Sequence, residues 1–247
     1  MMSLSKKIEK VTFVTYGDRN FHNSKYLLAR EASAFGFRNI VVESPETLPE
    51  DFKNKHSQFL SLPRGGGYWL WKSAIVRKNL RSLRDNDILL YADAGCSINQ
   101  NGRGRFSEWL QMCNDHDSLS FQMHVHPEKH WSKMSLVHYL ECNDPKYLET
   151  GQINATVFLL KKTSKVVEMI DTWFNVCSLE WTIDDTSSTI ANDPEFKDHR
   201  HDQSVFSLIR KKEGCFTIND ETYPSLTHNW NEETVRYTPV LATRRRF

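Results

Sequence analysis

The sequence lacks the features that mark several large classes of protein. Its 32 basic and 31 acidic residues nearly cancel, so no overall field would attract a polyanion, and nucleic acid is not expected as a partner. No window reaches the roughly 18 apolar residues of a membrane span, and the first residues hold no apolar stretch of signal-peptide length. We therefore expect a cytoplasmic protein with no transmembrane segment.

Cysteine is scarce, and the pattern of the five cysteines excludes several roles. They are odd in number and widely scattered, and no C-x-x-C pair is available for zinc or redox chemistry. We expect reduced thiols that are mostly buried. Internal repeats, low-complexity segments and breaks in composition are also lacking, so we expect a single domain over residues 1–247.

What the sequence does contain is the composition and pattern of an α/β protein. Apolar residues make up 39% and charged residues 26%, which is close to soluble globular chains and permits a sizeable core. Residues 11–16 (VTFVTY) predict a strand, a helical pattern follows and stops near Gly36, and residues 39–43 (NIVVE) predict a second strand. This β-α-β unit predicts parallel strands joined by a right-handed connection.

Further elements follow from the same periodicities. Residues 48–63 are polar and weakly periodic, the glycines at 65–67 predict a hinge or a close backbone approach, and the segment from residue 222 onward shows little periodicity. Helices are predicted within residues 68–83, 106–113, 164–177 and 202–212, and strands at residues 87–91, 118–123, 153–160 and 215–218.

The strand at residues 87–91 ends in Ala92, Asp93, Ala94 and Gly95. Ligands bind outside the carboxyl ends of parallel strands in open α/β sheets, so an aspartate at this exit is a candidate binding residue. The alternative is that Asp93 caps the next turn and that Gly95 permits a positive φ.

Four segments in chain order resemble the GT-A glycosyltransferases: residues 14–18 (VTYGD), 65–72 (GGGYWLWK), 89–96 (LLYADAGC) and 199–204 (HRHDQS). Each is short, and their order and spacing over about residues 11–230 carry the resemblance. The resemblance implies a Rossmann-like α/β fold, with a mixed, mainly parallel sheet flanked by helices. It also implies transfer of a sugar from a nucleotide-sugar donor, with a UDP-sugar favoured, to a glycan or other hydroxyl acceptor.

The resemblance places the donor nucleotide at two strand exits. Thr15, Tyr16 and Gly17 are implied to contact the base and ribose. The exit of residues 91–95 (YADAG) is similar to the Asp-x-Asp motif that holds the donor diphosphate through a divalent metal, so Asp93, Ala94 and Gly95 are implied to lie at the donor.

A Mn²⁺ or Mg²⁺ ion is implied at Asp93, because such ions prefer oxygen ligands and neutralise a diphosphate. Gly95 stands where the family's usual second carboxylate would be. His228 is a second candidate ligand, since some retaining members complete the metal shell with a histidine near the C-terminus. The alternative for His228 is a surface or hydrogen-bonded histidine.

Two basic residues are candidates for the donor phosphates. Lys72 follows the glycine stretch and Arg30 lies on the first helix, and either can offset diphosphate charge. Surface solvation is the alternative for Arg30. Trp69 and Trp71 are predicted to fill the core, with stacking on a ligand ring as the alternative.

The remaining candidates concern the transferred sugar. Asp202 is implied to stabilise an oxocarbenium-like transition state or to act as base, and Gln203 to orient the sugar, with His201 beside them. A helix cap is the alternative for Asp202. Gln152 and Asn154, at alternate strand positions, are implied to bind sugar hydroxyls or, alternatively, to satisfy backbone groups.

Two other readings of the same fold compete with sugar transfer. A nucleotidyltransferase usually opens with a glycine-rich basic loop, which residues 17–19 (GDR) match poorly. A non-catalytic carbohydrate-binding protein would explain the degenerate motif at Gly95. A dehydrogenase is disfavoured because no G-x-G-x-x-G follows the first strand. For the arginines at 244–246 we expect a solvated tail, with weak contact to an anionic membrane as the alternative.

Overall fold

The computed structural model describes residues 3–223 and 236–247. The strands of the main sheet are β1 Thr12–Tyr16, β2 Asn39–Glu43, β3 Ile88–Ala92, β5 Ser118–Pro127, β6 Gly151–Ile153, β7 Val157–Lys161 and β8 Thr217–Asn219. A separate two-stranded sheet pairs β4 Ser97–Ile98 with β9 Val240–Leu241.

The seven-stranded sheet is mixed, with the order β2-β1-β3-β7-β5-β6, and β8 pairs with β5 outside that order. β1 pairs in parallel with both β2 and β3, and β5 with β8. The pairs β3·β7, β5·β7 and β5·β6 are antiparallel. Together with the helices on its faces, this sheet confirms the predicted α/β fold with a mixed, helix-flanked sheet.

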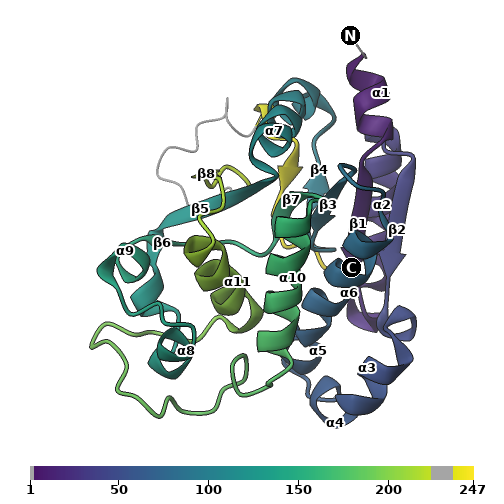
Figure 1. The fold of residues 1–247 in the computed structure, drawn as a ribbon. Helices are drawn as coiled ribbons and strands as arrows, with labels where there is room; N and C mark the ends of the chain where they lie inside the picture. The colour runs from purple at the N-terminus through teal and green to yellow at the C-terminus, as the bar shows by residue number, and fades with distance from the viewer. Residues whose placement is uncertain (1–2, 224–235) are drawn as a thin grey trace.

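The helices are α1 Leu4–Glu9, α2 His22–Phe35, α3 Glu50–Lys55, α4 Ser57–Leu60, α5 Gly65–Tyr68, α6 Leu70–Ser82, α7 Arg103–His116, α8 Met134–Tyr139, α9 Pro145–Leu148, α10 Ser164–Cys177 and α11 His201–Lys212. In Figure 1, α6, α10 and α11 lie side by side, and α10 contacts both of the others. Within the described part of the chain, no helix is long and apolar enough to cross a membrane.

The core has two halves because successive strand residues point to opposite faces of the sheet. Val14 and Tyr91 pack under α6, α10 and α11, whereas their neighbours Phe13 and Leu90 pack under α2 and α7. Both faces of the central strands are therefore buried. A ligand is therefore expected at the strand ends and not on the faces of the sheet.

Several sequence expectations are confirmed, and others need correction. β1 and β2 are parallel, and Gly36 ends α2 with a φ of 120°, which favours glycine. All five cysteines are free thiols, and four are buried. The strand predicted at 153–160 is instead divided between β6 and β7. The chain breaks there because Asn154 Oδ1 accepts hydrogen bonds from the backbone N–H groups of Thr156 and Val157, both at 3.2 Å.

The segment at residues 48–63, which predicted no regular element, contains the short helices α3 and α4. Phe52 in α3 and Phe59 in α4 are 5% and 8% exposed. They pack against the half of the core that includes Val14 and Tyr91. A spacing of seven residues places both side chains on one side of a helical path. The other apolar residues of this segment do not continue that spacing, so the periodicity was too weak to predict the two helices.

Candidate active site

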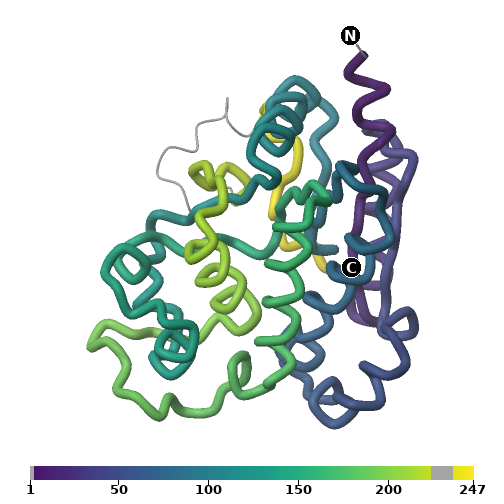
Figure 2. Tube along the Cα trace, in the orientation of Figure 1, coloured from purple at the N-terminus to yellow at the C-terminus, as the bar shows by residue number. Residues whose placement is uncertain are grey.

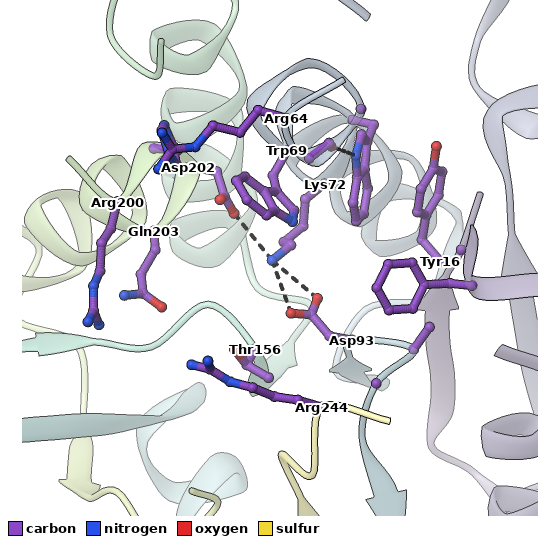
Figure 3. A pocket seen from close by; sticks show the side chains of 18 of the residues that line it. Tyr16, Arg64, Trp69, Lys72, Asp93, Thr156, Arg200, Asp202, Gln203 and Arg244 are labelled. Atoms are coloured by element: carbon purple, nitrogen blue, oxygen red, sulfur yellow. Dashed lines mark hydrogen bonds and ion pairs between the residues drawn. The ribbon is translucent and has the colours of Figure 1, made fainter. Parts of the chain in front are cut away.

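A pocket of about 710 Å³ lies at the carboxyl ends of β1 and β3, within the range of small-molecule sites. Its wall is formed by residues after both strands, by the turn before α6, by the start of α11 and by the segment after β9. Figure 3 shows the side chains that converge there. The parallel pairing of β1 with β3 brings the two exits to the same edge, as the sequence predicted.

Lys72 occupies the centre of this site, in the first turn of α6, and is 3% exposed. Its Nζ atom lies 3.2 Å from Asp93 Oδ1 and 3.4 Å from Asp202 Oδ2, and it donates to the Ala155 carbonyl at 3.2 Å. The Tyr91 hydroxyl donates a hydrogen bond to the same Asp93 Oδ1 atom, at 2.6 Å. One ammonium group is thus shared between two carboxylates from different elements (Figure 3).

The interaction of Lys72 with the two carboxylates shifts the pKa values of Lys72 and Asp202. Burial alone would lower the pKa of Lys72, but the carboxylates of Asp202 and Asp93 outweigh it and raise that pKa. Burial raises the pKa of Asp202 to about 7, because the ammonium group opposes this only partly and the Asp93 charge adds to it. Asp202 therefore changes charge near neutral pH, as suits an acid or base catalyst.

Gln203 is held in the pocket by a buried network. Its Nε2 donates to Gln152 Oε1 at 2.9 Å, and its Oε1 accepts from the Ala155 N–H at 3.3 Å. Gln152 in turn donates to Glu128 Oε1 at 2.9 Å, and Glu128 is fully buried. Gln152 does not line the pocket; it orients Gln203 from behind.

The turn before α6 is a left-handed helical turn. Gly65, Gly66, Gly67, Tyr68 and Trp69 all have positive φ, between 50° and 84°. The backbone approach predicted there is confirmed, since a Cβ on Gly67 would lie 2.7 Å from a backbone oxygen. Such a conformation costs a non-glycine residue about 1–2 kcal/mol, and strain of this kind gathers at functional sites.

Aromatic contacts hold this turn against α11. Trp69 stacks on the His201 ring with 5.4 Å between ring centroids, and His201 itself has a φ of 55°. Trp71 stacks on Tyr16 with 3.7 Å between centroids, and its Nε1 donates to the Gly65 carbonyl at 2.8 Å. Trp71 is buried as predicted, whereas Trp69 is half-buried and lines the pocket beside it.

Nine of the predicted site residues line this pocket: Tyr16, Gly17, Lys72, Asp93, Ala94, Gly95, His201, Asp202 and Gln203. The Nδ1 atom of His201 lies 2.7 Å from the Ile183 carbonyl oxygen, and its buried Nε2 has no hydrogen bond to the described residues. That nitrogen is the part of His201 left for other contacts.

Four of the predicted residues that the structure describes do not line the pocket: Thr15, Arg30, Gln152 and Asn154. Thr15 is fully buried within β1, where its side chain points to the face of the sheet opposite that of Tyr16. Arg30 lines a separate hollow on α2. Asn154 is buried and bonds backbone N–H groups, which was its alternative reading. His228 lies outside the described residues.

Four arginines that the sequence did not predict as site residues also line the pocket: Arg64, Arg200, Arg244 and Arg246. The Arg200 guanidinium lies 3.8 Å from the centroid of the Trp131 ring. Arg244 and Arg246 were expected in a solvated tail, but β9 pairs with β4 and carries the following residues to the pocket. Figure 2 shows the course of this C-terminal segment in yellow. The run of arginines was visible in the sequence; the pairing that places it was not.

The described residues fit a divalent metal ion poorly. Asp93 already accepts from Tyr91 and faces the Lys72 ammonium, and Gly95 offers no side chain. Across residues 3–223 and 236–247, no three histidine, cysteine or acidic side chains are grouped so that they could hold a metal. Among the described residues, Asp93 is thus the one candidate ligand at the strand exit for the ion that the resemblance implies.

Comparison with known proteins shows the fold. No known family matches the sequence, and no curated protein resembles it. A glycosyltransferase involved in glycosylation of the major capsid of PBCV-1 is similar, with a TM-score of 0.51 and 13% identity over 94% of this chain and 91% of that one. Apo mouse xyloside xylosyltransferase 1 has a TM-score of 0.50 and 11% identity over 94% and 97%. 

A third similar structure is the apo form of the bifunctional glycosyltransferase WbbM, with a TM-score of 0.52 and 12% identity over 94% of this chain and 45% of that one. All three likenesses fall at 13% identity or less, where what is shared is the course of the chain. The chain has the GT-A glycosyltransferase fold, as the order of its four segments predicted.

Proposed function

We propose that this protein transfers a sugar from a nucleotide-sugar donor, with a UDP-sugar favoured, to a glycan or other hydroxyl acceptor. The observation that carries the proposal is the Lys72 ammonium held between Asp93 and Asp202 in a pocket at the strand exits. The glycosyltransferase fold supports it. The acceptor chemistry is left at the level of a hydroxyl group.

The pocket offers a distinct environment for each part of a donor. Tyr16 and Gly17, at the carboxyl end of β1, suit the base and ribose, with the Tyr16 ring fixed by its stack on Trp71. The cationic side chains suit the diphosphate. The transferred sugar would then lie toward Asp202 and Gln203, at the start of α11.

Asp202 serves either of its implied roles only when it is deprotonated. A carboxylate stabilises the positive charge that develops on the sugar ring, and a carboxylate accepts a proton from the acceptor hydroxyl. Because the pKa of Asp202 is raised to about 7, the ionised fraction grows as pH rises through neutrality. We therefore expect the transfer rate to rise with pH through about 7.

The test measures nucleotide release from UDP-, GDP- and CMP-activated sugars, with wild type and three variants. Asp202→Asn and Asp93→Asn keep the side-chain shape and remove the charge, and each should lower the rate by about 100-fold or more. Asp51→Asn is the matched control, because Asp51 is exposed on α3 and does not line the pocket.

The outcomes separate the hypotheses. Wild-type rates in both Asp93→Asn and Asp202→Asn would show that these carboxylates are not the reacting site. Donor binding without turnover would favour the non-catalytic carbohydrate-binding reading. If wild type neither binds nor turns over any of the donors, the proposed activity is wrong.

A further inference from the structure

The pocket holds more positive charge than its own carboxylates neutralise. Its acidic residues are Asp18, Asp93, Asp198 and Asp202, and its basic residues are Arg64, Lys72, Arg200, Arg244 and Arg246. Lys72 is shared between Asp93 and Asp202, and Arg64 pairs with Asp198 at 3.1 Å. Arg200, Arg244 and Arg246 form no ion pair with any residue that the structure describes.

Arg244 is fixed to the exit of β3. The Arg245 N–H donates to the Gly95 carbonyl at 2.9 Å, and the Thr243 hydroxyl donates to the same oxygen at 3.0 Å. The Arg245 side chain anchors the segment through Glu31 at 2.6 and 2.7 Å and through the Cys96 carbonyl at 2.6 Å. Arg244, with a φ of 54°, is thereby directed into the pocket.

This segment stands where the resembling Asp-x-Asp motif would place its second carboxylate. A Cβ on Gly95 would lie 3.3 Å from the Arg244 Cα and 3.4 Å from the Arg245 carbonyl oxygen. A longer side chain at this position would therefore have to displace the segment. Figure 3 shows Arg244 passing below Asp93 and Thr156, toward the side of the pocket that holds Gln203 and Arg200.

We propose that the donor diphosphate is bound here by cationic side chains, with Arg244 at the β3 exit, and that this binding requires no divalent metal ion. The inference rests on the proposed function and specifies how its donor site is built. A guanidinium group is always protonated and presents a fork of N–H donors that matches phosphate oxygens. It supplies at the strand exit the positive charge that a metal ion would otherwise bring.

Isothermal titration with UDP and with uridine, each in EDTA and in Mn²⁺, tests this proposal. UDP should bind wild type equally well under both conditions. Arg244→Ala should weaken UDP binding by about tenfold or more, because a hydrogen bond to a charged group is lost, and should leave uridine binding unchanged. Arg244→Lys, which keeps the charge without the fork, should fall between the two.

Arg84→Ala is the matched control, because Arg84 is 86% exposed and precedes β3, at the end of the strand opposite the pocket. Its UDP affinity should equal that of wild type. Binding of UDP only in Mn²⁺ would overturn the inference and leave the proposed function standing. An equal loss of UDP and uridine affinity in Arg244→Ala would also overturn it, because Arg244 would not act on the diphosphate.

If UDP binds under neither condition and wild type releases no nucleotide from any of the activated sugars, the proposed function fails first and the inference falls with it. Should Arg244→Ala melt below wild type, the comparison of EDTA with Mn²⁺ in wild type and the Arg244→Lys variant still decide the question. Arg244 is exposed, so its replacement is expected to leave the melting temperature near that of wild type.

Discussion

Replacing Asp202 by asparagine should make the folded protein more stable at neutral pH, not less. The Asp202 carboxyl is fully buried beside a single ammonium group that it shares with Asp93, and burial raises its pKa from 3.8 to about 7. The folded chain therefore binds this proton more tightly than the unfolded chain does. Between those two pH values the free energy of unfolding of wild type falls as pH rises.

The size of the effect follows from the two pKa values. The interval from 3.8 to about 7, at about 1.4 kcal/mol for each pH unit, amounts to about 4 kcal/mol. An asparagine side chain does not titrate, so Asp202→Asn escapes this loss. Relative to wild type, the variant should gain about 4 kcal/mol of stability between about pH 4 and pH 8.

Urea unfolding of the two proteins across this pH range measures the difference directly. Taking the difference removes the titration of all groups that the substitution leaves unaffected. A difference that stays flat would show that the Asp202 pKa is unchanged by folding. A difference that shrinks or reverses as pH rises would show that the Lys72 ion pair dominates and holds Asp202 ionised, which refutes the reasoning.

Two further predictions concern buried groups outside the reacting site. Lys211 lies 2.8 Å from the fully buried Glu128, so Lys211→Met should lower the free energy of unfolding by about 3–5 kcal/mol, measured with urea. Its neighbour Lys212 pairs with an exposed carboxylate, so Lys212→Met should cost about 1 kcal/mol or less; equal effects would contradict the assignment. Gly67→Ala should lower the melting temperature, because its φ is 84° and a Cβ would meet a backbone oxygen at 2.7 Å. Gly104→Ala, in α7 with no atom within 4 Å of a Cβ, should instead stabilise by about 0.5–1 kcal/mol, and a loss there would point to an unseen contact.

The sequence predicts best what its local pattern determines. The helix expected at 164–177 has the bounds of α10, because an apolar stripe lies on one face and the Thr163 side chain caps its start. Asp93 was a candidate because it follows a predicted strand, and the resemblance added Gly17; the parallel pairing of β1 with β3 brings both to one pocket. That the domain extends over residues 1–247 stays a prediction.

Features that depend on distant partners were not predictable. β4 and β9 have two residues each, too few to show any periodicity, yet their pairing brings Arg244 to the pocket. The break at Asn154 depends on side-chain bonds to the backbone, which alternation of apolar residues does not reveal. Gln152 was assigned to sugar binding by the resemblance, and its hydrogen bond to the buried Glu128, 24 positions earlier, was not visible in the sequence.

The ion pair between Glu31 and Arg245 joins residues 214 positions apart. Closing so large a loop is unfavourable until many other contacts exist, so this part of the pocket should form late during folding. During synthesis, α2 and the parallel strands would be complete well before the chain reaches Arg244 and Arg245. Shortening the chain before residue 244 would then yield a protein with most of its core intact and an incomplete pocket, which a folding assay alone would not reveal.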